Sequence, residues 1–218
     1  MKRLLSLFFV CLILTTSGCT SSLEKDIFEG NDLDGSDGYS PFNLTDSNAS
    51  YFNSSNLDGE VILFNFFYTN CPDHCPTMTS DLKQIYQEYE SQIGINLSII
   101  SITVDPWRDA SSSLEDYMNF FNVSWPHLTI EFLNDENLSE IEQIWTEFEI
   151  GVVLTESENS TSVSGRGHTV YYSIEHTNGI VIVDKQGLQR VSWDESNWDV
   201  DGIKDDIDTL LKEPSSGY

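Results

Sequence analysis

Apolar residues are distributed along this chain in two patterns, and each pattern predicts a different element. Two stretches, Glu60 to Tyr68 and residues 97–104, are apolar almost without interruption. Runs of this length indicate strands that are buried on both faces of a sheet. Elsewhere apolar residues recur every three or four positions, which is typical of amphipathic helices. The predicted helices cover residues 77–93, 111–121, 138–148 and 200–211.

The second half of the chain adds strands to this pattern. After a polar stretch at residues 155–167, residues 168–176 predict a strand, and residues 179–193 predict a pair of strands that turns at Gln186-Gly187. This order of strands and helices predicts an α/β fold in which helices flank a central mixed sheet. An inserted hairpin is expected before the last strands.

The domain boundaries follow from where the periodic pattern begins and ends. Residues 19–56 are rich in Ser, Asn, Asp and Gly and have little periodic apolar content, so they are predicted to form a flexible polar tether. Residues 57–212 have the length of one domain. Residues 213–218 are predicted to be a C-terminal tail.

The first residues have the pattern of an export signal. Two basic residues precede an apolar run at residues 4–14, and small residues then lead to Cys19. The run is shorter than the roughly 20 residues of a spanning helix, so residues 1–18 are predicted to be a signal peptide. The Ser-Gly-Cys junction resembles the lipobox of prokaryotic lipoproteins, which implies a lipid on Cys19 at the extracytoplasmic face of the cell membrane. An uncleaved short anchor is the alternative.

The composition is strongly acidic, with 36 acidic residues against 10 basic ones and a formal net charge of −26. Such a surface repels the phosphates of nucleic acids, so nucleic-acid binding is excluded, whereas cations or basic partners are favoured. Adaptation to salt explains the same composition through solubility alone and is the simpler interpretation.

The candidate chemistry of the predicted domain lies in its two cysteines. Cys71 and Cys75 stand where the first buried strand gives way to a helix, and each is followed by proline. Their spacing places both sulfur atoms near the first helical turn, where backbone N–H groups favour thiolate. Two thiolates form a soft ligand set that suits Cu(I), and the prolines restrict the loop between them.

Three other roles compete with copper binding. An exported chain permits a structural disulfide, although so small a ring stabilises the fold little. A dithiol oxidoreductase of the thioredoxin type is the second alternative, but its motif has two residues between the cysteines and this chain has three. Thioredoxins also place a cis-proline opposite the thiols, and this chain has no candidate for it because no proline lies between Pro126 and Pro214. Zinc would need four ligands from the two thiolates and the histidines.

A third copper ligand must come from one of four histidines. His74 lies between the cysteines and is expected to point away from them. His127 lies in a predicted surface loop, and His168 begins the predicted strand that His176 ends. A strand end beside the central strand could bring His176 over the helix start.

Four segments together resemble the Sco/SenC family of cytochrome c oxidase copper chaperones over residues 57–211. LFNFFYTNCPDHCPTM is similar to the family's strand and Cys-Pro-Asp-X-Cys-Pro motif. SITVDPWRDASSSLEDYMNFF is similar to its Ser-X-X-Asp-Pro-X-Arg-Asp segment and the following helix. YYSIEH is similar to Tyr-X-Val-Asp-His, and VIVDKQG to the next strand and turn. The chain departs from the family at Glu175, where Asp is usual, and at Thr177, where Ser is usual.

This resemblance implies a thioredoxin-like fold and one copper ion per chain, Cu(I), Cu(II) or both, held by Cys71, Cys75 and His176. It implies a membrane-tethered metallochaperone, not an enzyme, that delivers copper to the binuclear centre of cytochrome c oxidase subunit II. Other copper chaperones or thiol reductases are possible further partners. The alternative is a thiol-disulfide reductase that keeps the cysteines of that centre reduced, with Cys71 and Cys75 as its redox-active pair.

Four charged residues match further positions of the family's motifs and are expected to support the site. Asp73 is expected to accept a hydrogen bond from the helix start or to bias the protonation of the site. Asp105, Arg108 and Asp109 are expected to form a loop that an Arg–carboxylate pair holds, with a structural rather than a ligating role.

Overall fold

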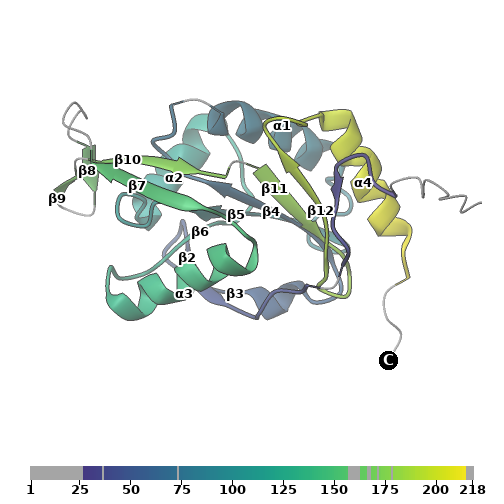
Figure 1. The fold of residues 1–218 in the computed structure, drawn as a ribbon, viewed down its shortest axis with the longest axis horizontal. Helices are drawn as coiled ribbons and strands as arrows, with labels where there is room; N and C mark the ends of the chain where they lie inside the picture. Colours follow the sequence, from purple (N-terminus) through teal and green to yellow (C-terminus); the bar gives the residue numbers. More distant parts are fainter. Residues whose placement is uncertain are drawn as a thin grey trace, which may run out of the picture.

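The structure, a computed structural model, describes residues 27–35, 37–72, 74–156, 163–165, 168–170, 172–177 and 179–214. Its centre is an eight-stranded mixed sheet with the order β1-β12-β11-β4-β5-β6-β2-β3 (Figure 1). Its strands are β1 (Asn31–Asp32), β2 (Asn43–Asp46), β3 (Tyr51–Asn53), β4 (Val61–Phe67), β5 (Leu97–Thr103), β6 (His127–Thr129), β11 (Gly179–Val183) and β12 (Gln189–Asp194). β5 runs parallel to β4 and β6, and the other described pairs are antiparallel.

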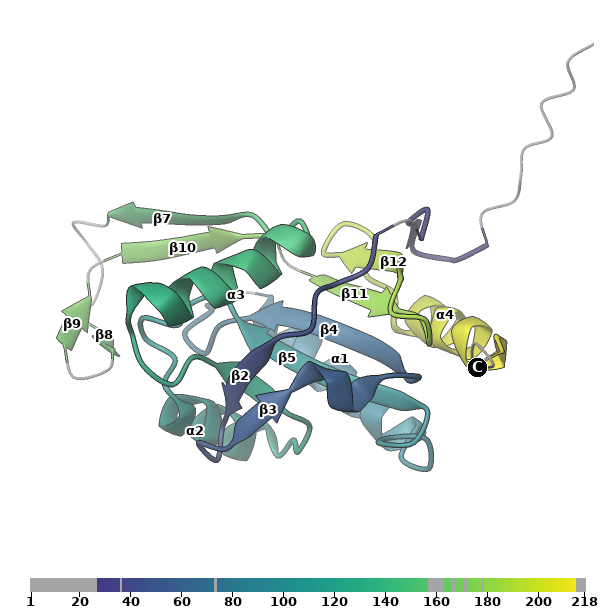
Figure 2. The same cartoon turned by 90° about the horizontal axis from the view of Figure 1, so that it is seen from below.

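Helices cover both faces of this sheet (Figure 2). They are α1 (Cys75–Glu88), α2 (Ser111–Phe121), α3 (Asp135–Glu147) and α4 (Val200–Lys212), and a short 3-10 helix, η1 (Ser54–Leu57), precedes β4. On one face Leu82 of α1 and Ile207 of α4 lie in a buried cluster with residues of β4 and β12. On the other face Leu114 of α2 and Ile141 of α3 lie in a second cluster. No helix in the described part of the chain has the length and apolar character needed to cross a membrane.

Local sequence sets the helix ends. The side chain of Asn134 accepts a hydrogen bond from the backbone N–H of Asn137, so α3 begins three residues before the predicted start. The side chain of Asp199 caps α4 in the same way. α2 ends where Asn122 adopts a left-handed conformation, which asparagine tolerates better than most residues. The predicted mixed sheet with flanking helices is confirmed, and both buried strands lie within one residue of their predicted ends.

A separate antiparallel pair stands before the last strands, as predicted. It consists of β7 (Val152–Glu156) and β10 (Tyr172–His176), which we call the hairpin arm (Figure 2). The single strand expected over residues 168–176 is instead two strands, because β9 (His168–Val170) pairs with β8 (Val163–Gly165) and not with β7. β7 was not predicted, since its adjacent residues Val153 and Leu154 are both exposed and produce no alternation.

The flexible tether expected over residues 19–56 is wrong for the described part of that segment. β1 pairs with β12 at one edge of the sheet, and β2 joins β6 to β3 at the other. Phe28, Phe42 and Leu44 are buried, and the carboxylate of Asp206 accepts backbone hydrogen bonds at 2.7 and 3.1 Å from the two residues after Phe28. Short strands and isolated buried apolar residues leave no periodic signal. The predicted signal peptide and Cys19 lie outside the described residues.

Candidate metal centre

The thiol loop, which we define as residues 68–75 apart from Asp73, connects the buried strand β4 to α1. Cys71 is half-buried in the loop, and Cys75, the first residue of α1, is buried with 2% of its surface exposed. Neither cysteine forms a disulfide in the described part of the chain. Pro76 falls in the first turn of α1, where its missing N–H costs no helical hydrogen bond. The sequence motif therefore sets where the strand stops and the helix starts.

His176, the last residue of the hairpin arm, faces the helix start as the sequence suggested. Its Nε2 atom lies 4.0 Å from the Sγ atom of Cys75. Its Nδ1 atom lies 3.0 Å from the carbonyl oxygen of Thr177, and because a carbonyl can only accept, we assign the ring proton to Nδ1. The lone pair of Nε2 is then directed to the sulfur side of the ring, as a metal ligand requires.

Burial and a hydrogen bond between the two thiols set the pKa of Cys75. A hydrogen bond with the Cys71 thiol, followed by burial, raises the pKa of Cys75 well above its ordinary value, and backbone hydrogen bonds lower it only in part. The backbone N–H groups of the helix start thus favour the thiolate of Cys75, as predicted, but the neighbouring thiol and burial outweigh them. A cation bound to this sulfur would have to replace its proton.

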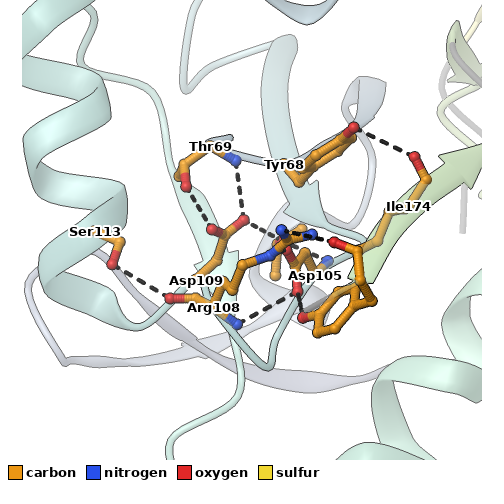
Figure 3. Close-up of polar contacts among 9 residues, drawn as sticks. Tyr68, Thr69, Asp105, Arg108, Asp109, Ser113 and Ile174 are labelled. Atoms are coloured by element: carbon orange, nitrogen blue, oxygen red, sulfur yellow. Dashed lines mark hydrogen bonds and ion pairs between the residues drawn. The ribbon is translucent and has the colours of Figure 1, made fainter. Parts of the chain in front are cut away.

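Asp109 fastens the thiol loop to the strand beneath it (Figure 3). Its carboxylate accepts hydrogen bonds from the backbone N–H of Thr69 at 3.0 Å, the hydroxyl of Thr69 at 2.5 Å and the hydroxyl of Thr103 at 2.6 Å. Burial, and then the nearby charge of Asp105, raises the pKa of Asp109 to about 6, and the same hydrogen bonds limit the rise. This aspartate thus links the end of β4 to the end of β5.

Asp105 and Arg108 fasten the hairpin arm (Figure 3). The two form a buried ion pair through Arg108 Nε and Asp105 Oδ2. The hydroxyl of Tyr172 donates to Asp105 Oδ1 at 2.5 Å, Arg108 Nη1 donates to the carbonyl of Tyr172 at 3.4 Å, and the guanidinium carbon lies 4.2 Å from the centre of the Tyr172 ring. Burial raises the pKa of Asp105 even though Tyr172 and Arg108 favour its charged form. The expected Arg–carboxylate pair is present, and it also holds a strand that carries His176.

Tyr68 connects the thiol loop directly to the hairpin arm. Its hydroxyl donates to the carbonyl of Ile174 at 3.3 Å (Figure 3), and its ring meets the ring of His176 edge to face with centroids 5.5 Å apart. Burial, and then the neighbouring cysteines, raises the pKa of Tyr68, so it remains a neutral phenol. Sequence reasoning missed Tyr68 and Tyr172, although the even spacing of Tyr172 and His176 in one strand places both on the same face.

The remaining predicted residues lie elsewhere. His127 was expected on a surface loop but is buried in β6 against Phe67 and Trp125, and burial lowers its pKa to about 4. The exposed His74 contacts Glu195 at 2.9 Å. His168 lies in β9, away from the strand of His176. Asp73 lies outside the described residues.

One pair of the expected donors lies at nearly the separation that a shared metal ion requires. Among the described side chains, no three His, Cys, Asp or Glu residues stand close enough together to coordinate a metal as they lie. Bonds of about 2.3 Å to sulfur and 2.0 Å to nitrogen, at about 120°, would require the sulfur and nitrogen atoms to be about 3.7 Å apart. The observed 4.0 Å between Cys75 and His176 is close to that distance. A small movement of these side chains is sufficient to close the pair on an ion.

A profile of the SCO1/SenC family matches residues 31–212. The chain belongs to the SCO1/SenC family. A SCO2-like protein of Rickettsia prowazekii (strain Madrid E) is 31% identical over 147 residues, which make up 67% of this chain and 64% of that protein. The chain therefore spans slightly less than two thirds of the length of this relative.

Solved Sco structures have the same fold as this chain. Yeast Sco1 with copper bound has a TM-score of 0.63 at 26% identity, covering 83% of this chain and 91% of that one. BsSco, described as a member of the Sco family of cytochrome c oxidase assembly proteins with a disulfide switch, has a TM-score of 0.59 at 23% identity, covering 84% and 99%. The predicted thioredoxin-like Sco fold is confirmed.

Proposed function

We propose that this protein is a copper-binding metallochaperone that carries one copper ion between Cys71, Cys75 and His176. The observation that carries the proposal is the 4.0 Å approach of His176 Nε2 to Cys75 Sγ across 101 residues of sequence. Two sulfur atoms and one imidazole nitrogen suit copper, because thiolates select Cu(I) and imidazole is a common ligand of Cu(II). The copper-bound state of yeast Sco1, a structural relative, supports the same cargo.

Copper uptake follows from the state of the thiols. The cation displaces the proton that the two cysteines share, so binding releases protons and weakens as the pH falls. The buried Cys75 holds the ion from the side of α1, and the half-buried Cys71 leaves one side of the site accessible. An incoming ligand of the acceptor can therefore replace the ligands of copper one at a time without complete loss of coordination.

The location and the partner follow from the N-terminal sequence and the family. A lipid on Cys19 would tether the domain to the extracytoplasmic face of the membrane, which no described helix crosses. The acceptor that we propose is the binuclear copper centre of cytochrome c oxidase subunit II, and the description of BsSco as an assembly protein of that oxidase supports this choice. Mass spectrometry of the native N-terminus tests the anchor, since an intact signal with unmodified Cys19 contradicts it.

The ligand set is tested by single substitutions. Cys71→Ser and Cys75→Ser should each abolish stoichiometric copper binding, whereas His176→Ala should retain Cu(I) on two thiolates and lose the Cu(II)–thiolate absorption band. His74→Ala is the matched control, because that histidine is adjacent in sequence but contacts Glu195. Retention of the band in His176→Ala with loss in His168→Ala would overturn the assignment of the third ligand.

A thiol-disulfide reductase that keeps the acceptor's cysteines reduced is the second candidate. Two observations favour it: the thiols of Cys71 and Cys75 hydrogen-bond to each other, and Cys71 is accessible. In that reaction the thiolate of Cys71 attacks a disulfide of the acceptor, Cys75 attacks the mixed disulfide, and the acceptor leaves as a dithiol while this protein becomes oxidised. Two results together would favour this candidate: His176→Ala reduces the acceptor fully, and neither the wild-type protein nor this variant delivers copper.

A further inference from the structure

The turn from Asp105 to Asp109 contacts both halves of the proposed copper site. At one end Asp109 binds the backbone of the thiol loop through Thr69. At the other end Asp105 and Arg108 bind Tyr172, four residues before His176 in β10. Four strand residues span about 13 Å, and Tyr172 and His176 project from the same face of the strand. The position of Tyr172 on this turn therefore sets how far His176 can approach Cys75.

We propose that Arg108 is a positioning residue for His176, and that it determines whether the site retains Cu(II) as well as Cu(I). This inference rests on the proposed copper-binding function. Arg108 contacts the hairpin arm in two ways, through its hydrogen bond to the Tyr172 carbonyl and through the stacking of its guanidinium on the Tyr172 ring. Both contacts depend on direction, so they fix the orientation of β10 as well as its distance.

The energetics of the cluster favour positioning over stabilisation. Arg108 and Asp105 are 5% and 0% exposed, and a buried ion pair of this kind is often no more stabilising than apolar residues of the same size. The Nη2 atom of Arg108 has no hydrogen-bond partner in the described part of the chain, which carries a further desolvation cost. Compared with apolar residues of the same size, the Asp105–Arg108 pair therefore contributes a defined geometry for β10 rather than additional stability.

The two oxidation states of copper respond differently to that geometry. Cu(I) is held by two thiolates of the thiol loop, whose backbone Asp109 binds at Thr69, and it needs no donor from the hairpin arm. Cu(II) needs a nitrogen or oxygen donor in addition, and His176 supplies it only while β10 stays in place. Loss of the Arg108 contacts should thus convert a site for both states into a site for Cu(I) alone.

Arg108→Gln and Tyr172→Phe test the proposal, with Arg190→Gln as the matched control. Like Arg108, Arg190 forms an ion pair with carboxylates, here those of Asp184 and Glu213; it is 19% exposed and lies in β12. We expect Arg108→Gln to weaken Cu(II) binding about 10-fold with loss of the charge-transfer band, and to change Cu(I) affinity less than about 3-fold. The double variant Arg108→Gln/His176→Ala should lose no more Cu(II) affinity than His176→Ala alone.

A measurement without copper separates this proposal from the function on which it rests. In the apo protein the His176 ring lies against the Tyr68 ring with centroids 5.5 Å apart, so the NMR shifts of its ring protons report the position of the imidazole. Arg108→Gln should move these shifts and speed amide exchange in β10. Tyr172→Phe loses only the hydroxyl contact with Asp105 and should produce a smaller change of the same kind, and Arg190→Gln should do neither. Unchanged shifts in Tyr172→Phe and in a folded Arg108→Gln would overturn the positioning role, as would additive Cu(II) losses in the double variant. A His176→Ala protein that keeps the Cu(II) band contradicts the ligand assignment instead.

Discussion

The thiol loop and the hairpin arm contribute to one site, but the fold holds them in different ways. The thiol loop begins at the end of β4, and every residue of β4 and of its parallel neighbour β5 is buried. In β10 only Ile174 is buried, and β7 exposes 57% of Val153 and 46% of Leu154. The proposed sulfur ligands thus follow a strand that is buried throughout, and the proposed nitrogen ligand, His176, stands on an element fastened by a few polar contacts. With that ligand set, this division would let His176 move while the two cysteines stay in place.

The largest expected effect comes from removing the fastening of the thiol loop. Asp109→Ala leaves the N–H and hydroxyl of Thr69 and the hydroxyl of Thr103 without their acceptor, so the free energy of unfolding should fall by about 3 kcal/mol. Denaturant unfolding measures this change, and Asp116→Ala on the exposed face of α2 is the control, expected within about 0.5 kcal/mol. Equal stability of the two variants would show that the loop does not depend on Asp109.

The stability of the central sheet should also depend on pH, because His127 is buried in β6. Its pKa of about 4 in the folded protein lies below the ordinary value of 6.5, because burial disfavours the charged ring. As the pH falls from 6.5 to 4, His127 becomes protonated in the unfolded chain but stays neutral in the folded protein. The free energy of unfolding, which is highest above pH 6.5, should therefore fall by about 3 kcal/mol at most. His127→Gln should remove this part of the slope when unfolding is followed at several pH values. A variant with the unchanged wild-type slope contradicts the assignment.

The hairpin arm should respond locally rather than globally. Ile174→Ala removes the one buried side chain among the described residues of β10 and should cost about 2 kcal/mol, the low end for such a truncation. Amide exchange should rise in β7 and β10 while β4 and β5 keep their protection, and the Cu(II) band should weaken more than Cu(I) binding. Uniform loss of protection across the sheet would show that the arm unfolds together with the body.

The smallest effect is expected on the outer surface of the arm. Val153→Ser changes a side chain that is 57% exposed, so the free energy of unfolding should change by less than about 0.5 kcal/mol and copper binding should be unaltered. Thermal unfolding and copper titration check both expectations. A loss of more than 1 kcal/mol would mean that this face is packed more tightly than its exposure indicates.

The difference between the two regions also explains which parts were predictable from the sequence. β4 and β5 are buried on both faces, so their composition alone identified them, and the motif around Cys71 and Cys75 follows directly. β7 and the short strands β1 to β3 bury too few residues to leave a period, and they were missed or assigned to the tether. His176 was found through its motif, but the roles of Tyr68 and Tyr172 depend on contacts 64 to 106 residues away in the chain, which no local pattern records.

The docking of the N-terminal segment would limit how far the domain could travel from the lipid that we propose on Cys19. Phe28 is already buried in the fold, so about eight residue steps separate the anchor from the first described residue, or roughly 28 Å at full extension. A tether that continued to Asn56 would have allowed roughly 130 Å. The domain of an anchored chain would therefore sample only a thin layer above the bilayer, and the acceptors within its reach are those whose copper ligands lie close to the lipid headgroups.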